Sequence, residues 1–173
     1  MCSFDVKYVI SNITSKFKIK QSTYLENACA EKPKLRTFVT YKNFSELPHY
    51  IVKPISFYER RLISKTRLGC LPIRIETGRY SIPRIPEQER TCLVCKNNVI
   101  ECEPHFLFSC SAYSIERDEW YSKMTLPNNF EEMTIDSKLK LVLNDPSNIK
   151  MTAKFIVKAY SIRSKILNGK NPT

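Results

Sequence analysis

The amino-acid sequence predicts a mainly α-helical protein with one extended, irregular segment in its middle. Glycine occurs only three times in 173 residues, which argues against a fold of many short strands and tight turns. Several stretches repeat apolar residues at the spacing of an amphipathic helix, and most prolines fall between those stretches. The length is sufficient for one domain with its own hydrophobic core.

The pattern divides the chain into three segments. We expect residues 1–32 to form a helical extension, residues 33–126 a helical core, and residues 127–173 a pair of C-terminal helices. The net charge is +11, and it is concentrated early, because residues 1–80 hold fifteen Lys and Arg against six Asp and Glu. A basic surface is drawn to phosphates, whose neutralisation releases counterions. Solubility alone would also account for such a charge.

Two helices are predicted in the first half of the core. Residues 33–45 fit a helix that starts at Pro33, since proline suits the first helical position. The second helix begins at Ser56, because Ser56 and Glu59 form a capping box that satisfies two backbone N–H groups, and it ends at Gly69. The helical spacing of its apolar residues predicts an inward face formed by Ile55, Tyr58 and Leu62. The outward face would then carry Arg60, Arg61, Ser64, Lys65 and Arg67.

Residues 71–90 form the predicted irregular segment. They are rich in proline, and we expect them to run extended around the core. Ile73 and Ile75 alternate with Arg74 and Glu76, which is a short strand-like pattern.

Three helices are predicted after the middle of the chain. Ser111 and Thr134 are suitable N-cap residues for the first two, and Gly169 suits the end of the last. The predicted helices cover about residues 112–124, 135–144 and 148–167.

One group of side chains has the spacing of metal ligands, Cys92-x2-Cys95-x9-His105-x4-Cys110. Two residues between cysteines allow one tight turn to direct both thiolates at one point, and a short helical turn does the same for His105 and Cys110. Three thiolates and one imidazole in a tetrahedron suit Zn²⁺, and four protein ligands leave no position for a catalytic water. The sequence therefore predicts a small helical domain built around one structural zinc ion.

The sequence offers two alternatives to this ligand set. A Cys-x2-Cys pair also occurs in redox proteins, but there it sits in a βαβ unit, which this sequence lacks. Cys102 lies between the two ligand pairs and competes with His105 for the site. We favour His105, because the longer loop from Cys95 and the His-x4-Cys pair match known ligand spacings.

The cellular compartment of the protein determines whether its cysteines form disulfides. No apolar run approaches the ~18 residues of a membrane span, and the first ten residues lack the apolar stretch of a signal peptide. We therefore expect an intracellular protein, nuclear or cytoplasmic, without a membrane partner. In that reducing setting seven cysteines indicate metal binding in preference to disulfides.

The zinc motif and the residues before it carry a resemblance to a known family. The stretches that carry it are Arg61-Leu62-Ile63-Ser64-Lys65-Thr66-Arg67, Ile75-Glu76-x-Gly78-Arg79-Tyr80, Cys92-x2-Cys95 and Glu101-x-Glu103-x-His105-Phe106-Leu107-Phe108-x-Cys110. With these stretches the chain is similar to the C-terminal region, downstream of the polymerase, of reverse transcriptases from non-LTR, LINE-like retrotransposons of invertebrates, often called the reverse-transcriptase zinc-binding region. The resemblance runs from about Leu35 to Arg117.

The resemblance implies a role in holding element RNA or target DNA, in a fragment or derived copy that lacks the polymerase and endonuclease parts. We expect a non-catalytic zinc-binding module that binds RNA or DNA and takes no small-molecule substrate. The four aspartates are far apart in sequence, whereas two-metal polymerases and nucleases need converging carboxylates. The candidate phosphate contacts are Arg60, Arg61, Lys65, Arg67, Arg74 and Arg79.

The alternative is a structural or protein-interaction remnant without a nucleic-acid role. In that case the arginines would pair with acids such as Glu59 and Glu76. A continuous exposed basic face would favour nucleic-acid binding, and arginines buried in the fold would favour the alternative.

Overall fold

The computed structural model describes residues 6–31, 35, 37–38 and 48–169. It confirms a small, mainly helical fold, and within the described residues the only extended pairing is a single antiparallel bridge between Thr91 and Ile100. The longer helices are α1 (Val6–Ala30), α4 (Phe57–Arg67), α6 (Ser114–Ser122), α7 (Ile135–Asn144) and α8 (Ile149–Leu167). The shorter elements are α3 (His49–Val52), α5 (Arg74–Thr77), η2 (Glu87–Glu89), η3 (His105–Ser109), η4 (Ser111–Tyr113) and η5 (Phe130–Glu132).

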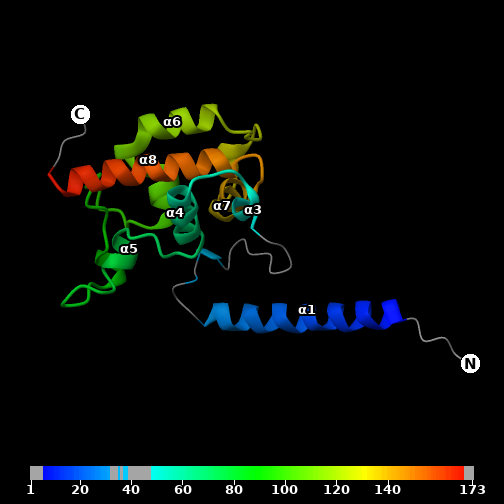
Figure 1. Cartoon of the computed structure of the whole chain (residues 1–173). Helices are drawn as coiled ribbons and strands as arrows, with labels where there is room; N and C mark the ends of the chain where they lie inside the picture. The colour runs from blue at the N-terminus through cyan, green and yellow to red at the C-terminus, as the bar shows by residue number, and fades with distance from the viewer. Residues whose placement is uncertain (1–5, 32–34, 36, 39–47, 170–173) are drawn as a thin grey trace, which may run out of the picture.

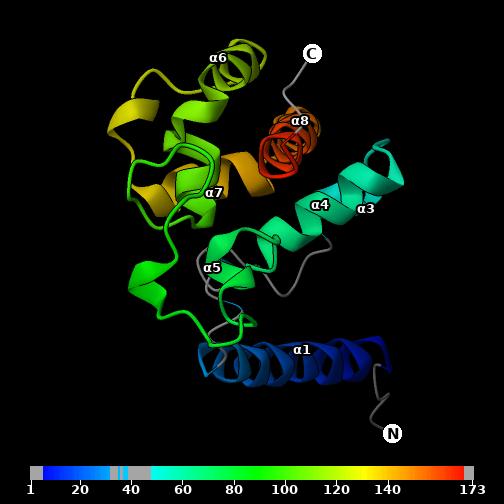
Figure 2. The ribbon, with the colours of Figure 1, turned by 90° about the vertical axis from the view of Figure 1, so that its left-hand side faces the viewer.

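Helix α8 is the centre of the fold, and α4, α6 and α7 pack around it (Figures 1 and 2). Its inward face is fully buried at Ile156 and Ala159. Trp120 of α6 stacks on Phe155 with ring centroids 4.3 Å apart. Removing one such side chain from water contributes roughly 1.5–3 kcal/mol, so these contacts join α6 to α8.

The predicted start and end of α4 are confirmed. The Ser56 side chain accepts a hydrogen bond from the Glu59 backbone N–H, and the Glu59 carboxylate accepts one from Ser56 N at 2.7 Å. The chain leaves the helix at Gly69, which has a φ of 67° and so uses the left-handed region that glycine tolerates.

The predicted inward face of α4 is partly wrong. Leu62 is buried as expected, but Tyr58 is exposed, and Arg67, expected to point outward, is only 4% exposed. Ile63, which was not assigned, is fully buried instead. The helix is therefore rotated relative to the prediction, because α8 and α7 together cover a different face from the one that the apolar spacing marks.

The middle segment, residues 71–90, is mostly irregular as predicted, but two short stretches of it are helical. The strand-like alternation at Ile73 to Glu76 forms the short helix α5, whose N-terminal N–H groups at Arg74 and Ile75 are bonded by Glu101. A β-strand needs a second strand along its edge to accept its hydrogen bonds. Here Glu101 offers only one carboxylate and one carbonyl, which suit the start of a helix. Tertiary contacts therefore override the local pattern.

The remaining boundaries agree closely with the sequence. Thr134 caps α7 by accepting a hydrogen bond from Ser137 N, and α7 and α8 begin and end within one residue of the prediction. The helix expected at residues 112–124 starts with the 3₁₀ turn η4 and becomes α-helical only as α6. Ser111 is not its N-cap as predicted, because it is the first residue of η4, and neither η4 nor α6 has a side-chain cap.

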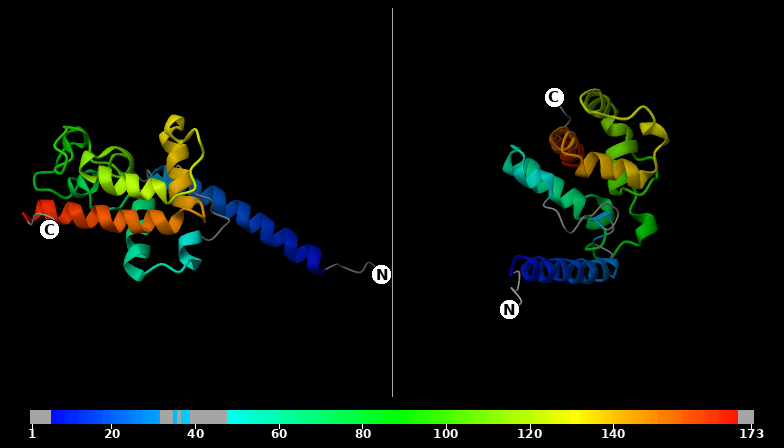
Figure 3. Two further views of the ribbon diagram at one scale, coloured as in Figure 1. Left: turned by 90° about the horizontal axis from the view of Figure 1, so that it is seen from above. Right: turned by 90° about the vertical axis from the view of Figure 1, so that its right-hand side faces the viewer.

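Helix α1 lies apart from the other helices in Figures 1 and 2 and in the right-hand view of Figure 3, whereas in the left-hand view its C-terminal end overlaps the rest of the fold. The helix predicted at residues 33–45 falls almost entirely outside the described residues. Of the helices that the structure describes, none combines the length and the apolar character that crossing a membrane requires.

Candidate metal centre

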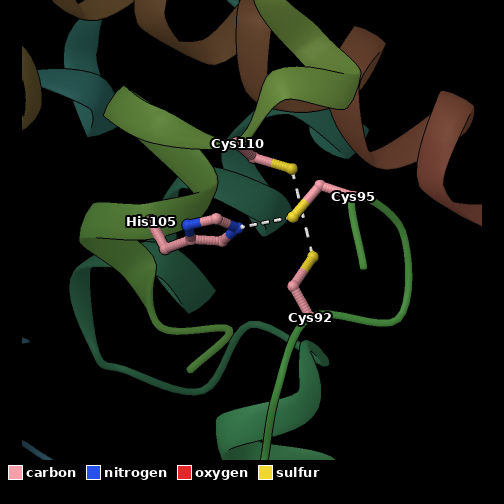
Figure 4. Close-up of side chains that lie close together, drawn as sticks. All are labelled: Cys92, Cys95, His105 and Cys110. Atoms are coloured by element: carbon pink, nitrogen blue, oxygen red, sulfur yellow. Dashed lines mark hydrogen bonds between the residues drawn. The ribbon is translucent and has the colours of Figure 1, made fainter. Parts of the chain in front are cut away.

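The structure brings together the four predicted ligand residues. Their donor atoms, three Sγ atoms and a ring nitrogen, all lie within 4.8 Å of one another. Figure 4 shows the four side chains pointing toward one point from two segments of chain. Cys102, the competing thiol, is not in this group. The group could hold a metal ion.

The first two donors stand on a narrow hairpin. Cys92 N donates to the Val99 carbonyl at 2.8 Å, next to the Thr91–Ile100 bridge, so the two arms of the hairpin are paired. Lys96 and Asn98 turn the chain with φ angles of 57° and 54°. Such angles are uncommon outside glycine, and here they fold the chain back directly after Cys95. The hairpin thereby sets both thiols on one side.

The other two donors stand on either side of the π-helical turn η3. In an α-helix, five residues rotate by roughly 500°, which would leave His105 and Cys110 about 140° apart. The wide turn closes instead with a hydrogen bond from Cys110 N to the His105 carbonyl at 2.8 Å, the i to i+5 pattern of a π-helix. This wider turn is what allows a four-residue gap to direct both donors to the same point.

Two short contacts join the donors in pairs. Cys92 Sγ lies 4.0 Å from Cys110 Sγ, and Cys95 Sγ lies 3.5 Å from His105 Nε2. The Cys110 thiol, hydrogen-bonded to Cys92, lowers the pKa of Cys92 to about 3, and the same contact raises the pKa of Cys110 above its usual range. Each thiol therefore shifts the pKa of the other, and a cation bound between them would stabilise both as thiolates.

Neighbouring residues hold the donors in position. Ser109 Oγ lies 3.2 Å from His105 Nδ1, on the ring nitrogen that points away from the other donors. Buried Arg117 of α6 donates from Nε to the Leu107 carbonyl at 2.9 Å and from Nη2 to the Cys110 carbonyl at 2.6 Å. Arg117 therefore holds the end of η3 to α6. Contacts of this kind fix ligand orientation in metal sites.

A second set of buried charges anchors the hairpin to the rest of the fold. Arg90, only 2% exposed, donates to the Ile75 carbonyl at 3.0 Å and, with two nitrogens, to the Ile85 carbonyl. Glu101 follows the second arm and pairs with Arg163 of α8. The four donors were predictable from their spacing, whereas Ser109, Arg90, Arg163 and the anchoring role of Arg117 were not. Glu101 and Arg117 lie within the resemblance described above, and no local signal marked Arg163.

The predicted phosphate contacts do not form one exposed basic face. Arg67 is buried, donates to the Leu143 carbonyl, and lies over the Tyr50 ring at 5.2 Å. Arg79 pairs with Glu76, with Nε 3.4 Å from Oε2, and its side chain is 13% exposed. Of the six predicted contacts, Arg61 is exposed, and three are half-buried: Arg60, Lys65 and Arg74.

The chain was compared with known protein families, curated proteins and solved structures. No protein family, no curated protein and no solved structure matches the chain.

Proposed function

We propose that the four donors bind one zinc ion, and that this ion has a structural role. The observation that supports the proposal is the size of the cluster. With Zn–S and Zn–N bonds of about 2.3 and 2.05 Å, a tetrahedral site has S–S and S–N edges of about 3.8 and 3.6 Å. Two of the six donor distances are close to these values, 4.0 Å between Cys92 and Cys110 and 3.5 Å between Cys95 and His105, and all six lie within 4.8 Å.

The donor set supports a non-catalytic role. Three thiolates and one imidazole would fill the four positions of a tetrahedral zinc ion, whereas catalytic zinc sites keep one position for water or substrate. A structural ion here would tie the hairpin at Cys92 to η3 and α6. The free energy of metal binding would then add to the stability of this part of the fold.

We further propose that the module binds nucleic acid through phosphate contacts, as the resemblance to the reverse-transcriptase zinc-binding region implies. The net charge of +11 supports this. With Arg67 and Arg79 engaged inside the fold, the contacts fall to exposed cations. Exposed Arg61 on α4 remains from the sequence-based set, and α8 adds the exposed residues Lys150, Lys154 and Lys165.

A salt-dependent binding titration tests the nucleic-acid proposal. Fluorescence anisotropy with labelled single- and double-stranded RNA and DNA would give log affinity against log salt for the zinc-loaded chain. Replacing Lys150, Lys154 and Lys165 with Gln should lower the slope by about 2–3, since each phosphate contact accounts for 0.7–0.9. Lys140→Gln, an exposed change on α7, serves as control and should leave the slope within the error.

A second candidate is a structural or protein-interaction module without a nucleic-acid role. The buried position of Arg67 and the pairing of Arg79 with Glu76 support it. This candidate would be favoured if the chain bound no RNA or DNA, or if its affinity depended neither on salt nor on the α8 lysines. The zinc proposal would be unaffected by that result.

A further inference from the structure

Helix α1 exposes a stripe of large apolar side chains. Ile10, Ile13, Phe17 and Tyr24 are 58%, 63%, 68% and 71% exposed. At 3.6 residues per turn, the four positions fall within an arc of roughly 60°. The helix is separated from the rest of the fold along most of its length (Figures 1 and 3). Nothing among the described residues covers this stripe.

The composition of α1 indicates that it depends on a partner to remain helical. Its 25 residues are rich in Val, Ile, Thr, Ser and Asn, which have lower helix propensity than Ala, Leu or Glu. Most helices in proteins are stabilised by packing an apolar face and not by propensity. A long helix of this composition with an unpacked face is therefore expected to be ordered by what binds it.

The charge of α1 limits what that partner is. Lys16, Lys18 and Lys20 are exposed, and Glu26 is the one acidic residue in the helix. By helical spacing, Lys16 and Lys20 lie along one edge of the apolar stripe, one turn apart. A second copy of α1 packed antiparallel on the stripe would bring lysines against lysines, and a parallel copy would leave them without acidic partners. The surface that covers α1 should therefore be acidic.

A further apolar residue indicates the shape of the partner. Ile19 is 67% exposed and, by spacing, lies on the side of the helix roughly opposite the stripe. A membrane surface or a single packed helix would cover the stripe and leave Ile19 in water. A partner that encloses the helix from both sides would cover both.

We propose that α1 is a recognition helix for an acidic protein that encloses it between two apolar grooves. Calcium-loaded EF-hand sensors of the calmodulin class offer this chemistry, with methionine-rich grooves that receive basic, amphipathic helices. The stripe residues provide the anchors, and Lys16 and Lys20 meet carboxylates at the rim. This proposal is independent of the metal site and of nucleic-acid binding.

Isothermal titration of the whole zinc-loaded chain with calcium-loaded calmodulin tests the proposal. The reference titration uses calmodulin freed of calcium beforehand, without added chelator, because a chelator would also remove zinc from the chain. We expect a one-to-one complex that forms only with calcium. Phe17→Ala should weaken it at least about tenfold, as expected for a central aromatic anchor, and Lys16→Glu with Lys20→Glu should weaken it further.

Phe57→Ala is the matched control, since Phe57 is 81% exposed on α4 and outside α1. It should leave the affinity unchanged. The absence of a calcium-dependent complex at micromolar concentrations overturns the proposal, and so does equal weakening by Phe17→Ala and Phe57→Ala. Phe17-dependent dimerisation in sedimentation, or Phe17-dependent binding to phosphatidylserine vesicles, would assign the stripe to a different partner and equally overturn it.

Discussion

Arg163 of α8 binds both carboxylate oxygens of Glu101, with Nε 2.7 Å from Oε1 and Nη2 2.9 Å from Oε2. Both residues are buried, and the same carboxylate accepts a hydrogen bond from Arg74 N at 2.6 Å. Three segments therefore meet at one side chain: the arm that follows the hairpin, the start of α5, and the central helix. The donors of the candidate metal site are attached to α8 through this contact.

Glu101→Gln should destabilise the chain by about 3–5 kcal/mol, because it leaves the buried Arg163 guanidinium without its anion. Urea unfolding followed by circular dichroism measures this change. Lys123→Met provides the comparison, since it removes a partner of the exposed residue Glu119 and should change stability by no more than about 0.5 kcal/mol. Equal effects of the two substitutions would contradict a structural role for the buried pair.

Cys95→Ser should abolish stoichiometric zinc binding, because it removes one of the four converging donors. Cys102→Ser should retain one zinc per chain, since Cys102 lies outside the donor cluster. Elemental analysis of protein purified under reducing conditions measures both. Wild-type protein without zinc would contradict the proposed metal, and the reverse result for the two variants would reassign the ligands.

Arg67→Ala should lower stability by about 2–3 kcal/mol, because it deprives a buried carbonyl and the Tyr50 ring of a charged partner. Arg61→Ala, a change on the same helix at an exposed position, should stay within about 0.5 kcal/mol. Thermal unfolding of the two variants separates the roles. A neutral Arg67→Ala would return Arg67 to the candidate phosphate contacts.

Gly78→Ala should destabilise by about 1–3 kcal/mol through overpacking. A Cβ at this position would lie 2.8 Å from Arg90 Cγ and 2.9 Å from Arg90 Cδ. Arg90 is buried and its guanidinium is bonded to two carbonyls, so it has little freedom to move. Thr77→Ala, one residue earlier and exposed, is the control for denaturant unfolding. Equal midpoints for the two variants would refute the close approach.

Lys123 and Lys158 each place Nζ 2.6 Å from a carboxylate oxygen of Glu119, and they lower the pKa of this exposed group from 4.5 to about 2. Because the folded-state pKa is the lower one, the contact stabilises the fold above pH 4.5 and is lost as the pH falls from 4.5 toward 2. Carbon-13 NMR titration of the carboxyl group measures the pKa. Lys158→Met and added salt should each raise it, and a pKa indifferent to both would contradict the contact.

The sequence predicted the parts of the fold that depend on near neighbours. The Ser56–Glu59 capping box and the Thr134 cap each use residues three positions apart, so their geometry is set locally. The four donors of the candidate metal site were also predictable from local sequence, since two short gaps and one loop define their spacing. Cys102 could be set aside on the same grounds of spacing.

What the sequence did not predict depends on distant contacts. Tyr58 and Arg67 were assigned to the wrong sides of α4, because the position of α8 decides which face is covered. The pairing of Glu101 with Arg163 joins residues 62 positions apart, and neither residue has a local feature that marks it as buried. The extent of the exposed basic surface was overestimated for the same reason. The local sequence around an arginine that donates to distant carbonyls does not differ from that around a solvent-exposed arginine.

The π-helical turn between His105 and Cys110 has a consequence for pattern searches. A π-turn is equivalent to a regular helix with one residue inserted. Without that residue, the histidine and the cysteine would stand four positions apart and still share one side of an α-helix. Remote relatives of this chain are therefore expected to include both His-x4-Cys and His-x3-Cys forms. A search profile for them should place a single-residue gap between positions 105 and 110 and allow none between Cys92 and Cys95, where one tight turn must direct both thiols to the same side.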